Sequence, residues 1–107
     1  MSFDVERVSY ELITTFRPLL PRIQRRDRAL AVQLTRAASS ISLNVSEGNY
    51  SDPGNRRARF FSAAGSANET RAALRVAMAW GYLTGSDAEA SLMLLDRLLA
   101  MLWKLSR

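Results

Sequence analysis

The side chains in this sequence that could do chemistry are two glutamates, Glu47 and Glu69, which lie among small polar residues. Two carboxylates held close together can serve as general acid and general base when their surroundings separate their pKa values. The polar residues around them recur at helical spacing: Arg36, Ser40, Asn44 and Glu47 in one segment, and Ser62, Ser66 and Glu69 in the next. At about 100° per residue, the first four fall within an arc of about 80°. We predict that these seven residues form a polar seam where two helices meet.

The polar seam admits two interpretations, a catalytic site and a structural hydrogen-bond network. Apolar residues such as Leu34, Ala37 and Ile41 flank it, and polar groups at the margin of a core must find hydrogen-bond partners. Di-iron bundles need Glu-x-x-His motifs, and this sequence contains no histidine. We favour the structural network, in which Arg36, Ser40 and Asn44 hold the two acids, and we expect no catalytic, cofactor-binding or metal-binding residue.

The elements that position the seam are helices, because no segment alternates polar and apolar residues as a strand would. The hydrophobic periodicity predicts four helices, over residues 4–20, 27–47, 55–80 and 86–105. Pro18 and Pro21 mark the end of the first helix, Gly48 and Asn49 stop the second, and residues 51–54 form the following turn. The short connections predict one all-α domain over residues 1–107, an antiparallel up-down-up-down four-helix bundle.

The last predicted helix, with Ser86 as its N-cap, has two apolar seams. The first seam follows a heptad pattern and comprises Ala88, Leu92, Leu95, Leu99 and Leu102. The second seam comprises Leu94, Leu98, Met101 and Leu105. Together with Trp103 they span an arc of about 200°, about twice what one core requires. We predict that another copy of the chain covers the second seam; the alternative is a wide stripe packed between two helices of one bundle.

The composition points to a single basic domain of the cytoplasm. The 107 residues carry a net charge of +5, from fourteen arginines and one lysine against ten acids, and include no cysteine. The lack of cysteine excludes disulfides and thiolate nucleophiles. The first residues lack the pattern of a signal peptide, and no apolar run is long enough to span a bilayer. We therefore expect cytoplasmic localisation and no membrane partner.

The excess of arginine favours an anionic partner, because guanidinium groups bind phosphate bidentately. Two clusters are the nucleic-acid candidates: Arg22, Arg25, Arg26 and Arg28 near the first break, and Arg57, Arg71 and Arg75 on one stripe of the third helix. No aromatic residue is interleaved with them, and no known nucleic-acid-binding motif is present. We predict sequence-independent contacts with the phosphates of RNA or DNA. The alternative is that these arginines only solvate helix faces.

Residues 33–48 carry the pattern Q-L-x-R-A-x-x-S-I-x-x-N-x-x-E-G, and residues 63–69 carry A-x-G-S-x-x-E. This combination resembles the four-helix bundle family encoded by intervening sequences in bacterial 23S ribosomal RNA genes, over nearly the whole chain. More distantly, the chain is similar to the accessory proteins of diversity-generating retroelements. The signature positions that the resemblance carries over are Arg36, Ser40, Asn44, Glu47, Gly48, Gly65, Ser66 and Glu69. Ser62, which follows the atypical pair Phe60 and Phe61, departs from the larger aliphatic residue usual in the family.

The resemblance to the 23S family implies an antiparallel four-helix bundle that assembles as a pentamer. The more distant likeness to the retroelement accessory proteins implies nucleic acid and a protein such as a reverse transcriptase as partners. Taken with the charge, it predicts a non-enzymatic homo-oligomeric adaptor that associates with RNA or a ribonucleoprotein. A ring of subunits would turn one weak basic patch into an avid surface. The alternative is a structural scaffold that binds proteins and makes no contact with nucleic acid.

Overall fold

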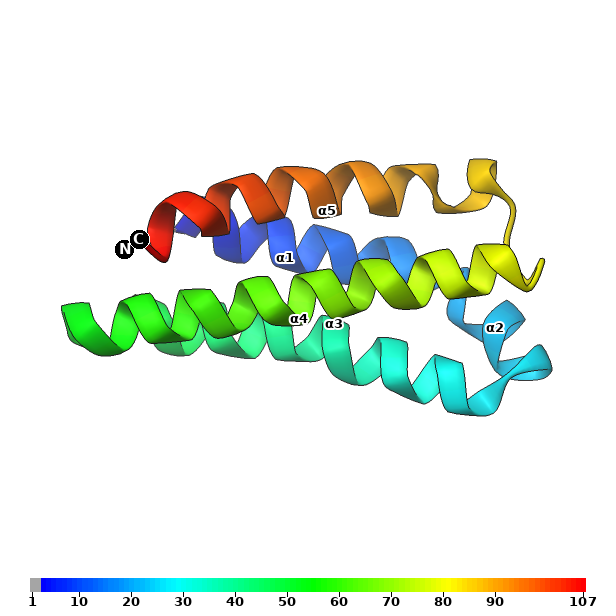
Figure 1. Cartoon of the computed structure of the whole chain (residues 1–107), viewed down its shortest axis with the longest axis horizontal. Helices are drawn as coiled ribbons and strands as arrows, with labels where there is room; N and C mark the ends of the chain where they lie inside the picture. Colours follow the sequence, from blue (N-terminus) through cyan, green and yellow to red (C-terminus); the bar gives the residue numbers. More distant parts are fainter. Residues whose placement is uncertain (1–2) are drawn as a thin grey trace.

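The computed structural model describes residues 3–107, which form five helices and no strand (Figure 1). The helices are α1 (Phe3–Phe16), α2 (Leu20–Arg26), α3 (Arg28–Asn49), α4 (Pro53–Ala79) and α5 (Gly85–Leu105). The predicted all-α fold is confirmed, with one short helix more than predicted. Residues 1 and 2 of the predicted domain lie outside the described residues.

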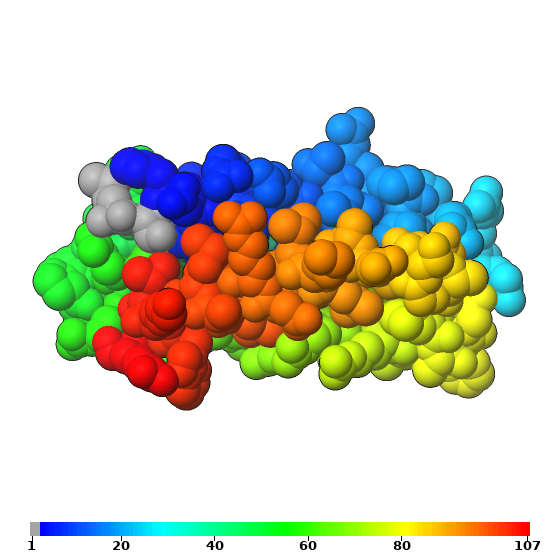
Figure 2. Space-filling view, turned by 90° about the horizontal axis from the view of Figure 1, so that it is seen from above, coloured from blue at the N-terminus to red at the C-terminus, as the bar shows by residue number. Residues whose placement is uncertain are grey.

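The four long helices alternate in direction, and their main contacts give the order α1, α3, α4, α5 around the bundle. Figure 2 shows α1 and α5 side by side on one face, and the short α2 packs against α3 at one end. The bundle measures 42 × 22 × 19 Å. None of the helices within residues 3–107 is both long enough and apolar enough to cross a membrane.

The first break in the bundle lies earlier than the sequence predicted. Helix α1 ends at Phe16, because Pro18 has no N–H to continue it and disfavours helical geometry at the residue before. Helix α2 then starts with Pro21 in its first turn, where the missing N–H costs nothing. Asp27 ends α2 and caps α3 by accepting a hydrogen bond from the Leu30 N–H at 3.0 Å. A helix of seven residues is too short to show a clear hydrophobic period.

The prediction that Gly48 and Asn49 stop the second long helix is wrong. Both residues belong to the last turn of α3, where they are buried. A Cβ on Gly48 would lie only 2.9 Å from Cε1 of Phe60. Glycine is therefore needed here because α4 approaches α3 closely, with the buried Phe60 ring against the glycine backbone.

Helix α4 starts at Pro53, so residues 53 and 54 are helical and the predicted turn over 51–54 is too long. Asp52 is the N-cap and accepts a hydrogen bond from the Asn55 N–H at 3.0 Å, which lowers the pKa of Asp52. The interior of α4 is rich in alanine, whose small side chains let helices approach closely, and its buried face against the core includes Ala63, Ala67, Ala73 and Ala77.

The N-cap of α5 is Thr84, and the predicted cap Ser86 is wrong. Thr84 and Asp87 form a capping box, in which the Asp87 N–H donates to the Thr84 hydroxyl at 3.0 Å and the Thr84 N–H donates to the Asp87 carboxylate at 2.8 Å. Arg22 on α2 also donates to this carboxylate at 3.0 Å. The hydrogen bond from Arg22, followed by that from the Thr84 backbone, lowers the pKa of Asp87 to about 2.

Helix α5 packs with both of its apolar seams against its own bundle. In the first seam Ala88, Leu95 and Leu102 are fully buried. In the predicted second seam Leu98 is also fully buried, while Leu94, Met101 and Leu105 pack partly buried against the same core. The prediction that another copy covers this seam is therefore wrong for Leu98, and it stays a prediction for Leu94, Met101 and Leu105.

Candidate functional site

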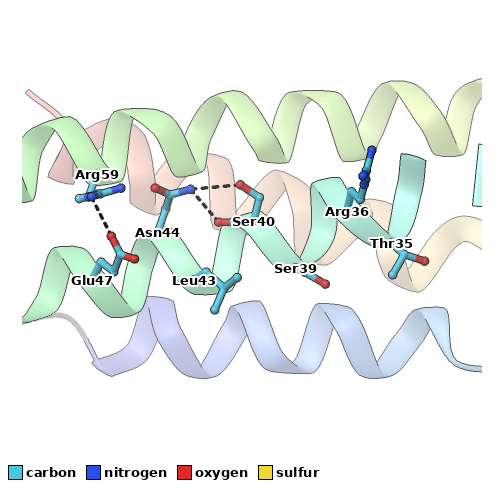
Figure 3. Close-up of a pocket in the computed structure, with 8 residues that line it drawn as sticks. All are labelled: Thr35, Arg36, Ser39, Ser40, Leu43, Asn44, Glu47 and Arg59. Carbon is cyan, nitrogen blue, oxygen red and sulfur yellow. Dashed lines mark hydrogen bonds and ion pairs between the residues drawn. The ribbon is translucent and has the colours of Figure 1, made fainter. Parts of the chain in front are cut away.

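The centre of the polar seam joins α3 to α4, and Figure 3 shows its α3 side with Ser40 and Asn44. The Ser66 hydroxyl donates to the Ser40 hydroxyl across the two helices at 2.9 Å. Asn44 donates from Nδ2 to the Ser40 carbonyl at 2.9 Å and to its hydroxyl at 3.1 Å. On α4, the buried Thr70 hydroxyl donates to the Ser66 carbonyl at 2.7 Å. The structure thus brings together the middle of the predicted seam as a hydrogen-bond network.

The ends of the predicted seam are arranged differently. Glu47 forms an ion pair with Arg59 at 2.9 Å, a residue that the sequence analysis did not select. Arg36 is exposed at the opposite end of the same shallow pocket, whose volume is about 420 Å³ and which α3 lines with residues from Thr35 to Glu47. Ser62 and Glu69 are exposed on α4. The expected hydrogen bonds from Arg36, Ser40 and Asn44 to the acids are replaced by the Arg59 ion pair at Glu47.

The two glutamates do not form a carboxylate pair. Ser40 lies opposite Ser66, and from this point Glu47 is seven residues along α3 while Glu69 is three residues along α4. Because the two helices are antiparallel, these steps run in opposite directions and separate the glutamates by about 15 Å along the bundle. The expectation that Glu47 and Glu69 come close is therefore wrong. Among residues 3–107, no cluster of three acidic side chains could hold a metal ion.

Two polar contacts inside the bundle escaped the sequence analysis. The buried Ser42 hydroxyl donates to Ser9 at 2.9 Å and links α3 to α1. Thr15 and Ser91 share a hydrogen bond of 2.7 Å between α1 and α5. The signal was present in part, because Ser9 falls on the apolar stripe of α1, where a polar residue needs a partner.

A third contact ties the end of α3 to the start of α1. Asn49 is only 2% exposed, and its Nδ2 donates to Oε1 of Glu6 at 2.8 Å. The other carboxylate oxygen of Glu6 accepts from the Tyr10 hydroxyl at 2.7 Å, and this hydrogen bond raises the pKa of Tyr10. The sequence analysis took Asn49 for a helix stop, so this role was missed.

The first arginine cluster lies at the end of the bundle where α2 packs (Figure 1). Arg25, Arg26 and Arg28 are exposed, whereas Arg22 is held by the ion pair with Asp87. The intervening Asp27 carboxylate caps α3 and accepts from the Tyr82 hydroxyl at 3.3 Å. We call Arg25, Arg26 and Arg28 the arginine end.

Aromatic side chains from the α4–α5 connection reach the arginine end. The Arg26 guanidinium carbon lies 5.5 Å from the centroid of the Tyr82 ring. The rings of Trp80 and Tyr82 are nearly parallel, at 16°, with centroids 6.4 Å apart. Partial desolvation and the negative charge of Asp27, whose carboxylate accepts the hydrogen bond from the Tyr82 hydroxyl, raise the pKa of Tyr82. No aromatic residue lies among these arginines in the sequence, but the fold places the Tyr82 ring beside Arg26, so the expectation that the cluster has no aromatic neighbour is wrong.

The second predicted cluster is dispersed along α4. Arg71 forms an ion pair with Asp96 at 3.3 Å and donates to Asn68 at 2.9 Å. Arg57 and Arg75 are exposed on the same stripe, but Arg57 lies about 21 Å along the helix from Arg71. The three arginines therefore do not form one patch.

These features define an all-helical bundle in which α3 and α4 share a polar seam and one end carries exposed arginines. The chain belongs to the 23S rRNA-intervening sequence protein family, whose sequence model matches residues 2–104. This confirms the resemblance inferred from the motif. The pentameric assembly and the partners that the resemblance implied stay predictions.

A solved structure with the same fold is that of a protein of unknown function from the S23 ribosomal protein family of Bacteroides thetaiotaomicron. The two structures agree with a TM-score of 0.88 over 96% of this chain and 98% of that chain. Their sequences are 19% identical, so the likeness concerns the fold. Comparison with curated proteins finds no match.

Proposed function

We propose that this protein is a non-enzymatic adaptor that binds the phosphate backbone of RNA, or of a ribonucleoprotein, through the arginine end. The observation that carries the proposal is the exposure of Arg25, Arg26 and Arg28 within one turn of chain, beside carboxylates that are already engaged. The name of the family refers to 23S rRNA, which makes RNA the first nucleic acid to test.

The position of Arg28 supports a role in binding an anion. It is the first residue of α3, where the helix dipole disfavours a cation. Its charge therefore does not stabilise the helix, whereas Arg25 and Arg26 in the last turn of α2 do benefit from the dipole. The three guanidinium groups at one end form a concentrated positive charge of the kind that binds phosphate.

Replacing Arg25, Arg26 and Arg28 together by glutamine is expected to weaken RNA binding about tenfold or more at moderate salt. Each lost phosphate contact should also reduce the slope of log K against log salt by about 0.7, so the triple variant should lose about 2 in slope. Fluorescence anisotropy of labelled RNA, titrated at several salt concentrations, measures both quantities.

The matched control removes the same charge elsewhere, by replacing the exposed residues Arg57, Arg97 and Lys104 with glutamine. It should change affinity much less than the triple variant at the arginine end. Equal losses in the two variants would show that only net charge matters and would contradict the proposed site. If the affinity of the wild-type protein for RNA does not change with salt, the proposed phosphate binding is contradicted, and the alternative function as a protein-binding scaffold is favoured.

The adaptor is also proposed to self-associate, through a pocket between α4 and α5 in place of the predicted leucine seam. This pocket of about 460 Å³ is lined in part by small residues, including Ala64, Gly65 and Ala100. Phe61, which is 68% exposed, and the exposed Trp103 stand at its margin. Exposed apolar surface of this kind marks an interaction site, and a second copy would add the avidity that one arginine end lacks.

Replacing Phe61 by serine is expected to lower the molar mass of the protein in solution, because it removes apolar surface from the contact between copies. Light scattering over a range of concentrations measures this mass. Met93 on α5 is similarly exposed but lies outside the pocket, so Met93→Ser is the control and should not change it. A wild-type protein that is monomeric at all concentrations would refute self-association.

A further inference from the structure

The α4–α5 connection holds two aromatic rings in a fixed arrangement beside the arginine end. The Tyr82 N–H donates to the Ala77 carbonyl at 2.9 Å, and the Gly81 N–H donates to the Met78 carbonyl at 3.0 Å. These two bonds form a Schellman motif, in which Gly81 takes the required positive φ of 80°. The motif reverses the chain between Trp80 and Tyr82, so that their rings can stack.

Tyr82 is fixed further by two residues at the junction of α2 and α3. Its hydroxyl donates to Asp27, and its ring lies 5.5 Å from the Arg26 guanidinium. Trp80 lies on the outer side of this arrangement and is 67% exposed. Because Tyr82 covers at most one face of the indole, a large part of the Trp80 ring is available to a ligand.

We infer that Trp80, supported by Tyr82 and Arg26, is a stacking platform for unpaired bases, so that the arginine end binds single-stranded nucleic acid in preference to duplex. This inference rests on the proposed function and specifies the form of nucleic acid that the same site takes. Arginines that follow the phosphates and an aromatic ring that stacks on bases together characterise single-strand sites. In a duplex the bases are stacked on one another, so their faces are closed to an indole.

The rigidity of the platform favours binding. The Schellman motif, the ring stack and the hydrogen bond to Asp27 restrain the two aromatic residues before any ligand arrives. Less conformational entropy is then lost when a base stacks on Trp80. Arg25 and Arg28, which are exposed and flank Arg26 and Asp27 along the chain, would bind the phosphates of the same strand.

The test compares four labelled oligonucleotides of about 12 nucleotides, a length within the span of small single-strand sites. They are single-stranded RNA, single-stranded DNA of the same sequence, an abasic strand with the same number of phosphates, and the duplex. The wild-type protein should bind both single strands more tightly than the abasic strand and the duplex. Trp80→Ala should weaken binding of the single strands by about 5- to 100-fold and leave the abasic strand unaffected. Trp80→Phe keeps an aromatic face and should retain most of the affinity.

Tyr50→Ala is the matched control, because Tyr50 is an exposed aromatic residue at the C-cap of α3, as Trp80 is at the C-cap of α4. It should not change binding. If Trp80→Ala weakens binding of single-stranded RNA, of single-stranded DNA or of both, the platform is supported, and the result shows which nucleic acid it binds. If Trp80→Ala binds like wild type, or if the abasic strand binds as well as the others, the platform is refuted. The arginine triple variant would still weaken binding in that case, so the proposed function would stand; failure of the wild-type protein to bind any strand would refute both.

Discussion

Replacing Phe60 by alanine is expected to lower the free energy of unfolding by about 3 to 5 kcal/mol. The Phe60 ring is almost completely buried and packs so close to Gly48 that a Cβ on this glycine would lie 2.9 Å from Cε1 of the ring. The substitution would open a cavity beside Gly48, which has no side chain that could fill it. Since a domain of this size has about 5 to 15 kcal/mol of stability, the variant should be close to unfolding. Denaturation by urea, followed by circular dichroism, measures the change.

The neighbouring residue gives a control of identical chemistry. Phe61 is exposed, so Phe61→Ala should change the free energy of unfolding by less than about 1 kcal/mol. The two variants should be compared at a dilution at which light scattering gives them the same molar mass. Similar losses from both would mean that the packing of Phe60 against Gly48 is not the main stabilising contact at this end of the bundle.

Replacing Asn49 by aspartate is expected to cost about 3 kcal/mol at neutral pH. The introduced carboxylate would be buried and would face Glu6, which now accepts a hydrogen bond from Asn49 at 2.8 Å. Burial and the nearby negative charge would raise the pKa of the introduced group in the folded state above its unfolded value. The loss should therefore grow as the pH rises above about 4 and fade below it, where the carboxyl is protonated in both states.

Asn49→Ala separates the effect of charge from the loss of the hydrogen bond. It should cost about 1 to 2 kcal/mol, with no rise above pH 4 of the kind expected for the aspartate variant. Urea denaturation of both variants from acid to neutral pH distinguishes them. An aspartate variant whose loss does not depend on pH would show that the buried site accommodates the charge through solvent or a structural change.

The long helices could be predicted from the sequence because each has a sustained apolar stripe. Their ends depend on single hydrogen bonds, and here residue type was a poorer guide. Ser86 and Thr84 are both acceptable N-caps, and only the reciprocal bond with Asp87 selects Thr84. Gly48 resembles a helix stop, but the ring of Phe60, which lies far along the chain, decides that it is a contact point.

The polar seam could be predicted in its middle and not at its ends. Ser40 and Ser66 meet because both lie at the margin of an apolar stripe, which periodicity reveals. The partner of Glu47 is decided by the register of α3 against α4, which places Arg59 beside it. Likewise, the approach of Trp80 and Tyr82 to Arg26 follows from the chain reversal at Gly81, which brings together residues that no local pattern connects.

The start of α1 and the end of α5 lie at the same end of the bundle, and the arginine end is at the other (Figure 1). The bundle is 42 Å long, so a tag or fusion partner attached at either terminus is held far from Arg25, Arg26 and Arg28. A protein tethered to a sensor surface through its tag would therefore display these guanidinium groups outward, and immobilisation should leave its affinity for RNA the same as that of the free protein.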